Sequence, residues 1–444
     1  MSKSVKSLYR NIITIVLCLN FIAPLLSNEA KNQTKPWTVM LWIAADNDLE
    51  IFLERNLKQM AKIGSNQQVN IVAFISGFDV SKQQKTAKYA LVEKGSVKIL
   101  STQTDPQLTD SGNPDLLAHF CLTAIQDFPA EKYALIFWDH GTGVIDPHRQ
   151  ARINMTEFAP FFEFENPHYG PSYFEELSQQ DNIRGVCFDE TARTYLTEQK
   201  IRYALNTICT KGLGGKKLDL IGFDACLMAM IEIAAFLEPY ADYMVGSQEV
   251  ELGTGWDYSR ALSIFQNTDP SPQELGTHIT QAYAKTYSFT SDYTFSCLDL
   301  KKLPAFIELF KKLSSFLCEA IKKQPSLKDF IASGRYHHTC THFDDPDYID
   351  AHHLLTNLMN KVNTSKYGDK KESKEFQSTL KAILSETIAC LEAVVVANRC
   401  GSYFPHATGA SLYFPEYSIH RSYKKNKFAQ ESGWFQFLHT YLSL

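Results

Sequence analysis

The sequence lacks any surplus of positive charge. It carries 44 Lys and Arg residues against 49 Asp and Glu residues, a formal net charge of -5 at pH 7. A surface that binds nucleic acid needs basic side chains to neutralise phosphates, so no nucleic-acid partner is expected. Gly141-Thr142-Gly143 lacks the third glycine and the lysine of a phosphate-binding loop, which argues against nucleotide binding.

The ten cysteines include no Cys-x-x-Cys pair and are scattered widely, so the chain has no disulfide scaffold. Removal of Cys18 with an N-terminal segment would leave an odd number, and hence at least one unpaired thiol. The stretch His337–His342, followed by Asp350 and His353, has metal-ligand residue types but no standard zinc spacing. We therefore expect no metal and no cofactor, and the redox state stays open.

Long hydrophobic runs are absent apart from one near the N-terminus. Lys3, Lys6 and Arg10 precede the apolar run 12–26, which is short for a membrane span. This pattern predicts a signal peptide or an uncleaved N-terminal anchor at 1–27, followed by a polar linker at 28–35. We expect a secreted or cell-envelope (periplasmic) protein whose contact with a membrane, if any, is that anchor.

Apolar runs without polar alternation dominate the first half and are typical of strands buried on both faces. The runs span residues 37–45, 70–76, 133–138, 218–223 and 243–246, and helical patterns at 49–63, 114–128, 197–209 and 227–237 lie between them. Strands alternating with helices predict an α/β fold with a mainly parallel sheet flanked by helices. We assign residues 36–265 to this α/β domain, with an irregular, aromatic insertion at 145–184.

The C-terminal region, residues 266–444, has a more helical pattern. Amphipathic helices are expected at 272–287, 303–323 and 374–397, with a short one at 434–442. Segments 401–405 and 409–415 have a strand-like pattern, and these strands can pack back against the core of the first domain. The sequence carries no signal for an oligomeric state.

Two of the buried strands run directly into reactive side chains. One ends at Asp139-His140-Gly141 and the other at Asp224-Ala225-Cys226. Because parallel strands end at a common edge, His140 and Cys226 meet if the two strands are neighbours. A cysteine at the start of the helix 227–237 gains thiolate stabilisation from the helix dipole, while an imidazole handles the proton. The amides of Gly141 and Cys226 are placed to bind a developing oxyanion.

Other interpretations of these residues remain open at this point. Taken alone, Cys226 could be an ordinary buried core residue, and His140 could be a loop residue whose ring nitrogens are hydrogen-bonded locally. Asp139 and Asp224 together suggest a hydrolase that uses a carboxylate pair, as glycosidases do.

Several passages resemble the clostripain family of cysteine peptidases, which groups with caspases, legumains and gingipains. They are residues 37–50 (WTVMLWIAADNDLE), 133–143 (YALIFWDHGTG), 218–234 (LDLIGFDACLMAMIEIA), 245–258 (VGSQEVELGTGWDY) and 409–415 (GASLYFP). The resemblance implies a caspase-like fold in which His140 is the general base or proton manager, Cys226 the nucleophile and Gly141 an oxyanion contributor. The chain departs from the family where Val144 replaces a common tryptophan and where the insertion 145–184 is long.

The resemblance further implies cleavage of protein or peptide substrates after Arg or Lys, which requires an acidic group in the specificity pocket. Asp224 is the first choice, because two residues before Cys226 it lies on the same side of an extended strand. Asp257 is the second and Glu249 the third. Helix capping is the competing role for Asp224.

Relatives in this family are commonly processed after a basic residue, and some depend on calcium. Arg149, Arg152 and Arg184 lie in or beside the insertion and are available for self-cleavage. No EF-hand loop is present, so calcium dependence rests on the resemblance alone. The alternative function is a catalytically inactive, exported binding or adhesion protein on the same fold.

Overall fold

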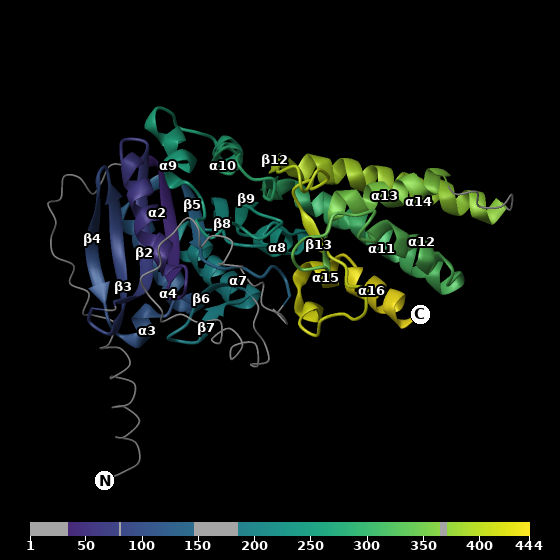
Figure 1. Ribbon diagram of the computed structural model, residues 1–444, viewed down its shortest axis with the longest axis horizontal. Helices are drawn as coiled ribbons and strands as arrows, with labels where there is room; N and C mark the ends of the chain where they lie inside the picture. Colours follow the sequence, from purple (N-terminus) through teal and green to yellow (C-terminus); the bar gives the residue numbers. More distant parts are fainter. Residues whose placement is uncertain (1–33, 80, 146–184, 365–370) are drawn as a thin grey trace, which may run out of the picture.

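The computed structural model describes residues 34–79, 81–145, 185–364 and 371–444. Its centre is a nine-stranded sheet in the order β12-β10-β9-β8-β5-β1-β2-β3-β4 (Figure 1). The five middle strands are parallel: β2 (Val69–Asp79), β1 (Lys35–Ala45), β5 (Ala130–Trp138), β8 (Leu218–Asp224) and β9 (Ala241–Gly246). The predicted α/β fold with a mainly parallel sheet is therefore confirmed.

Both edges of the sheet are antiparallel. β3 (Gln84–Glu93) and β4 (Ser96–Gln103) form one edge, and β10 (Thr294–Asp299) and β12 (Val395–Cys400) form the other. The sheet thus continues across residue 265, the boundary expected from the sequence. The helix expected to reach residue 397 ends at Val394, where the chain turns into β12.

Each face of the sheet packs against its own hydrophobic core. Along β1, Val39, Leu41 and Ile43 enter the core beneath α2 (Glu50–Ile63), α9 (Tyr258–Ala261) and α10 (Pro272–Thr286). Met40, Trp42 and Ala44 enter the opposite core, covered by α4 (Pro114–Asp127), α7 (Glu198–Thr207) and α8 (Ile231–Leu237). Burial on both faces explains why this strand is apolar at nearly every position.

The C-terminal helices form an arm beyond β12 (Figure 1). The arm consists of α11 (Leu303–Lys323), α12 (Leu327–Arg335), α13 (Ala351–Thr364) and α14 (Lys371–Val394), while α15 (Lys427–Glu431) and α16 (Trp434–Ser443) pack against α11. The strand expected at 409–415 is β13 (Ser411–Tyr413), which pairs with β11 (Tyr348–Asp350) in a small separate sheet. Residues 401–405 form turns rather than a strand.

The remaining elements are short. They are α3 (Pro106–Thr109), the hairpin of β6 (Val186–Asp189) and β7 (Thr194–Leu196), and single helical turns at Ile208–Gly212, Ser263–Gln266, Leu300–Lys302 and Tyr423–Lys425. None of the helices in the described ranges has both the length and the apolar character needed to cross a membrane.

Candidate active site

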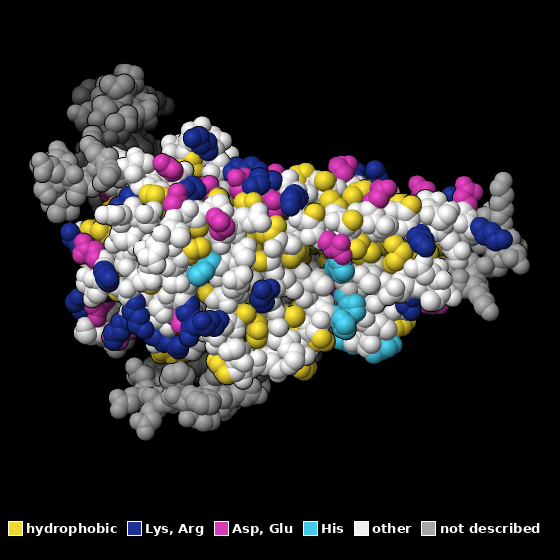
Figure 2. All heavy atoms as spheres, turned by 90° about the horizontal axis from the view of Figure 1, so that it is seen from above, with side chains coloured by type: hydrophobic (Ala, Val, Ile, Leu, Met, Phe, Trp, Pro, Cys, Tyr) yellow, Lys and Arg dark blue, Asp and Glu magenta, His cyan; other side chains and the backbone are white. Residues whose placement is uncertain are grey.

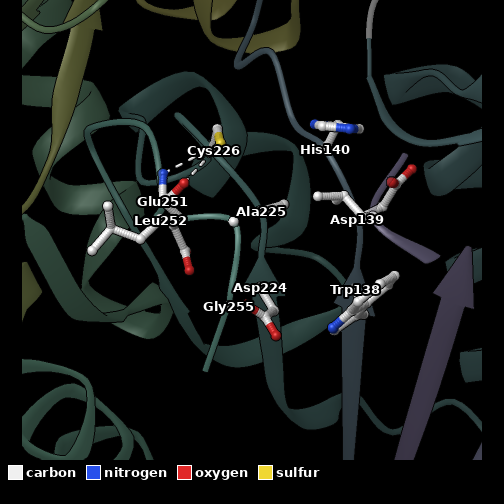
Figure 3. A pocket seen from close by; sticks show the side chains of 11 residues that line it. Trp138, Asp139, His140, Asp224, Ala225, Cys226, Glu251, Leu252 and Gly255 are labelled. Carbon is white, nitrogen blue, oxygen red and sulfur yellow. Dashed lines mark hydrogen bonds between the residues drawn. The ribbon is translucent and has the colours of Figure 1, made fainter. Parts of the chain in front are cut away.

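His140 and Cys226 follow two adjacent strands. β5 and β8 pair in parallel, with Trp138 opposite Asp224, and the Asp139 amide donates to the Asp224 carbonyl at 3.2 Å. Both residues line one pocket at this edge of the sheet (Figure 3). The pocket has a volume of about 20 Å³, which is room for about one water molecule. In the described state it is therefore closed to a substrate side chain.

Gly141 lies directly against the backbone of the segment that carries Cys226. A Cβ atom at this position would be 2.5 Å from the Cys226 carbonyl oxygen and 3.0 Å from the Met228 side chain. No side chain larger than hydrogen fits there without moving the backbone. Glycine is therefore a steric requirement at this position.

His140 forms an ion pair that the sequence did not reveal. Its Nε2 atom lies 2.6 Å from Oδ1 of Asp48, in the loop between β1 and α2. Burial opposes protonation of the imidazole, but Asp48, with Asp139 and Glu190, outweighs burial and raises the His140 pKa to about 9. Burial likewise disfavours the Asp48 carboxylate, yet His140 and local amides lower its net pKa. His140 is therefore protonated at neutral pH.

A polar network holds the loops that carry these side chains. Asn47 donates from Nδ2 to Oδ1 of Asp139 at 2.7 Å and to the Phe188 carbonyl at 3.0 Å, and the Phe188 amide donates to Asp139. Burial raises the Asp139 pKa to about 8. Asp139 accepts hydrogen bonds from Asn47 and from the Phe188 amide, and in this way it holds the loop next to His140 in place.

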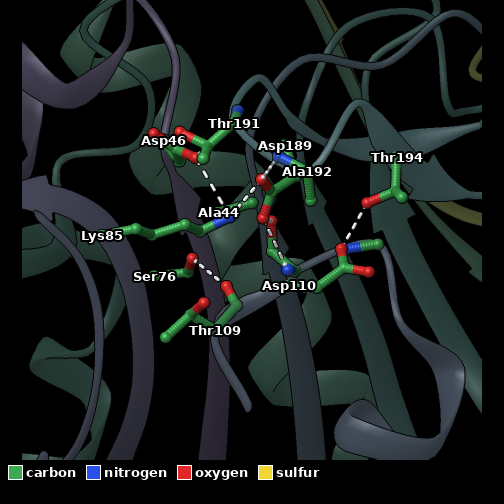
Figure 4. A network of polar contacts seen from close by, with 12 residues as sticks. Ala44, Asp46, Ser76, Lys85, Thr109, Asp110, Asp189, Thr191, Ala192 and Thr194 are labelled. Carbon is green, nitrogen blue, oxygen red and sulfur yellow. Dashed lines mark hydrogen bonds and ion pairs between the residues drawn. The ribbon is translucent and has the colours of Figure 1, made fainter. Parts of the chain in front are cut away.

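Lys85, on β3, connects the end of β1 to the β6–β7 hairpin through two ion pairs (Figure 4). Its ammonium is ion-paired with Asp46, at 3.0 Å, and with Asp189. Asp189 also accepts from the amide and the hydroxyl of Ser111. The Lys85 side chain is only 9% exposed, so this network fixes the β6–β7 hairpin to the end of β1 in a poorly solvated environment.

The Cys226 thiol is held by the backbone of Glu251. Its Sγ atom accepts from the Glu251 amide at 3.3 Å and donates to the Glu251 carbonyl at 3.8 Å (Figure 3). Burial, with the nearby Glu251 carboxyl, raises the thiol pKa well above its usual value. Cys226 is therefore a neutral thiol in the described state.

The helix expected directly after Cys226 begins later, and that prediction was wrong. Helix α8 starts at Ile231. Leu227 has a φ of 61°, outside the helical region, and Ala229 donates to the Ser247 carbonyl while Met230 bridges to Ser411. Because residues 227–230 bond to other segments, they cannot form a first helical turn. The helix dipole does not act directly on the thiol.

Asp224 lies at the wall of the pocket and does not cap a helix. Its Oδ1 atom accepts from the Trp256 amide at 3.0 Å, and its Oδ2 atom accepts from the Tyr258 hydroxyl at 2.8 Å. Burial raises the Asp224 pKa to about 7. The residue at the N-cap position of α8 is Met230.

Asp257 and Glu249 have other partners and do not line the pocket. Asp257 caps α9 through the Ser259 amide and pairs with Nε of Arg260 at 3.0 Å. Glu249 accepts from the amides of Val250 and Asp344. Of the three acidic residues expected in the pocket, only Asp224 lines it.

Glu251 lines the pocket together with Asp139 and Asp224, and the sequence did not single it out. Glu251 is 4% exposed, and it follows β9, the strand next to β8. Glu251 is 25 positions from Cys226 in the sequence, so no local pattern indicates the contact between its backbone and the thiol. The signal that could have found it is the order of the strands, since the loop after β9 has to pass the end of β8.

The histidine-rich stretch forms no metal site within the described residues, where no group of three His, Cys, Asp or Glu side chains could hold an ion. Nδ1 and Nε2 of His342 lie at hydrogen-bonding distance from the carbonyls of Pro346 and Arg335. The ring of His337 stacks on that of His342. The nine cysteines in the described part of the chain are all free thiols.

A cysteine and a histidine that follow neighbouring strands of a mainly parallel α/β sheet and line one pocket are the residue types of a cysteine hydrolase. A model of the clostripain family (peptidase C11) matches residues 41–156 and 168–441, so the chain belongs to this family of cysteine peptidases. This assignment favours the peptidase over the adhesion protein and the glycosidase.

Individual relatives agree with the family. The chain is 22% identical to clostripain of Hathewaya histolytica over 472 residues, covering 93% of this chain and 82% of clostripain. The fold is similar to a secreted C11 cysteine protease from Bacteroides thetaiotaomicron in complex with an irreversible peptide inhibitor, with a TM-score of 0.56 and 16% identity. An inactive zymogen C11 protease from Parabacteroides distasonis has a TM-score of 0.57 and 16% identity. Both alignments cover 90% of this chain and 99% of the other.

Proposed function

We propose that this cysteine peptidase is an endopeptidase that cleaves after Arg or Lys, with Cys226 as nucleophile and His140 as the acid–base group. The observation that carries the proposal is the pairing of β5 with β8, after which both residues line one pocket. Gly141 is proposed as an oxyanion contributor through its amide.

The chemistry follows from the protonation states of the two groups. The Cys226 thiol releases its proton to bulk water, and the resulting thiolate attacks the substrate carbonyl, which forms a tetrahedral oxyanion. His140, an imidazolium held by Asp48, donates its proton to the departing amine, leaving a thioester on Cys226. Water then hydrolyses the thioester. His140 thus acts first as a general acid, while Asp48 stabilises its charge.

Recognition of a basic residue is assigned to Asp224. Its carboxyl is buried at the pocket wall and, within the described residues, forms no ion pair with Lys, Arg or His. A buried carboxylate has a lower free energy when it is paired with a cationic side chain than when it is charged and alone. Asp257, already paired with Arg260, has no free role of this kind.

Two further parts of the proposal fall on residues outside the described ranges. Export is supported by the relative from Bacteroides thetaiotaomicron, which is described as secreted, and by the N-terminal sequence pattern at 1–27. Self-processing is proposed at Arg149, Arg152 or Arg184. Purified Cys226→Ala protein that remains uncut, beside cut wild type, would support self-cleavage.

The test of specificity is a fluorogenic peptide panel that varies only the residue before the scissile bond. Wild-type protein should turn over Arg and Lys peptides and leave Leu and Glu peptides intact. Asp224→Asn should lower kcat/KM for the basic peptides by at least about tenfold, because a charge-assisted contact is lost. Asp257→Asn is the control and should stay near wild type. Equal loss in both variants would remove Asp224 from the pocket role.

A further inference from the structure

Glu251 contacts both functional parts of the pocket. Its backbone amide and carbonyl hold Sγ of Cys226, while its side chain lies in the pocket wall beside the carboxyl of Asp224. In Figure 3 the carboxyls of Glu251 and Asp224 both lie below Cys226 and His140. One residue therefore links the nucleophile to the acidic end of the pocket.

The Glu251 carboxyl is buried, and neither of its oxygen atoms forms a hydrogen bond of good geometry. The polar groups within reach of it are the Asp224 carboxyl, the Ala225 amide and the Trp256 indole. The indole nitrogen of Trp256 is likewise without a partner. In the part of the chain that the structure describes, no lysine, arginine or histidine pairs with Glu251 or Asp224. A buried carboxyl such as that of Glu251, with neither a cation nor a well-formed hydrogen bond, is costly in a protein interior.

A planar cation is the ligand that removes this cost. A guanidinium has five N–H donors in one plane and can bind two carboxylates at once, whereas an ammonium is a compact point charge. The adjacent carboxyls of Asp224 and Glu251 therefore favour arginine over lysine. The free space is far smaller than a guanidinium, so the pocket wall, which includes the segment 251–255, has to move as the side chain enters.

That movement also affects the nucleophile, because the same segment holds the thiol. We propose that Glu251 is a second specificity residue, which binds the arginine guanidinium together with Asp224 and, as it shifts, releases the Cys226 thiol from its own backbone. The inference rests on the proposed Arg-directed cleavage through Cys226. Binding of the correct side chain and exposure of the nucleophile are then one event, a form of induced fit.

The test uses methylguanidine as a minimal cation and alkylation of Cys226 by iodoacetamide, followed by peptide mass spectrometry. Methylguanidine should accelerate alkylation of Cys226 in wild type by about fivefold or more, as expected for induced fit. The acceleration should be lost in Glu251→Gln. Glu232→Gln is the matched control, since Glu232 is a fully buried carboxyl on α8 outside the pocket; it should respond like wild type.

Turnover supplies an independent readout. Glu251→Gln should lower the ratio of kcat/KM for Arg over Lys peptides by about tenfold, mostly through KM. Glu251→Asp keeps the charge, should retain an intermediate ratio, and tests the same point if the Gln variant folds poorly. An unchanged ratio, or acceleration of alkylation equal in wild type and Glu251→Gln, would overturn the inference. Failure of the proposed function is recognised separately, because Cys226→Ala would then still cleave the peptides.

Discussion

The Nε2 atom of His140 lies 2.6 Å from Oδ1 of Asp48, and this contact joins the end of β5 to the loop after β1. The carboxylate keeps the imidazole protonated despite its burial. An enzyme that uses this imidazolium as a general acid should lose activity when the proton is lost.

Asp48→Asn should therefore shift the alkaline limb of the pH profile. In wild type, kcat/KM should fall as the pH rises through about 9, the His140 pKa. Without Asp48 the limb should move down by about two pH units, toward the unperturbed histidine value. The profile is measured with an arginine peptide, whose guanidinium does not titrate in this range. Asp269→Asn, at a half-exposed ion pair remote from the site, is the control. A uniform loss of rate without a shift would show that Asp48 is merely structural.

The stability of this ion pair has its own pH dependence. Because the His140 pKa is raised in the folded protein, the contribution is fully present below the unfolded histidine pKa and is lost as the pH rises through about 9. The difference in unfolding free energy between wild type and Asp48→Asn should accordingly shrink between pH 6.5 and pH 9. Urea denaturation at the two pH values measures it, and a constant difference would contradict the pairing.

Gly141→Ala should cost roughly a hundredfold in kcat/KM, because displacement of reacting groups by about 1 Å has an effect of this size. The added Cβ would meet the Cys226 carbonyl and Met228. Gly77→Ala is the matched control, since its Cβ would find the nearest heavy atom at 3.6 Å. Comparable activity of the two variants would show that the approach of the strand ends does not matter for turnover.

Lys85→Met should lower the free energy of unfolding by about 3–5 kcal/mol, because it leaves two buried carboxylates without their cation. Asp46 and Asp189 are 6% and 0% exposed in their side chains. Lys58→Met removes an ion pair whose partners are 72% and 80% exposed, and should change stability by less than about 1 kcal/mol. Urea denaturation of both variants measures the difference. Equal effects would mean that the Lys85 network contributes no more than a surface pair.

The sequence alone predicts the central strands of the sheet, but it does not predict the contacts between distant loops that complete the site. β1, β5 and β8 are apolar at nearly every position because helices cover both faces, and that pattern is visible without coordinates. β10 was missed because it is short and carries three polar residues, of which Ser296 bonds to the Gly409 carbonyl. The start of α8 was misplaced because residues 227–230 are held by Ser247 and Ser411, which are distant in sequence.

Asp48 and Glu251 escaped prediction for a related reason. Each lies in a loop after a strand that neighbours β5 or β8, and its contact depends on the order of strands in the sheet. Periodicity identifies a strand but does not state its neighbours. His140 and Cys226 were recognisable because each follows its strand immediately, within motifs that resemble one family.

The central claim is that Cys226 is the nucleophile and depends on His140. Its most direct test is covalent labelling with a peptidyl arginine chloromethyl ketone, followed by intact mass measurement and peptide mapping of wild type, Cys226→Ala and His140→Ala. We predict a single adduct on Cys226 in wild type, none in Cys226→Ala, and strongly slowed labelling in His140→Ala. An adduct on any of the other cysteines, or labelling of Cys226 at an unchanged rate without His140, would contradict the account.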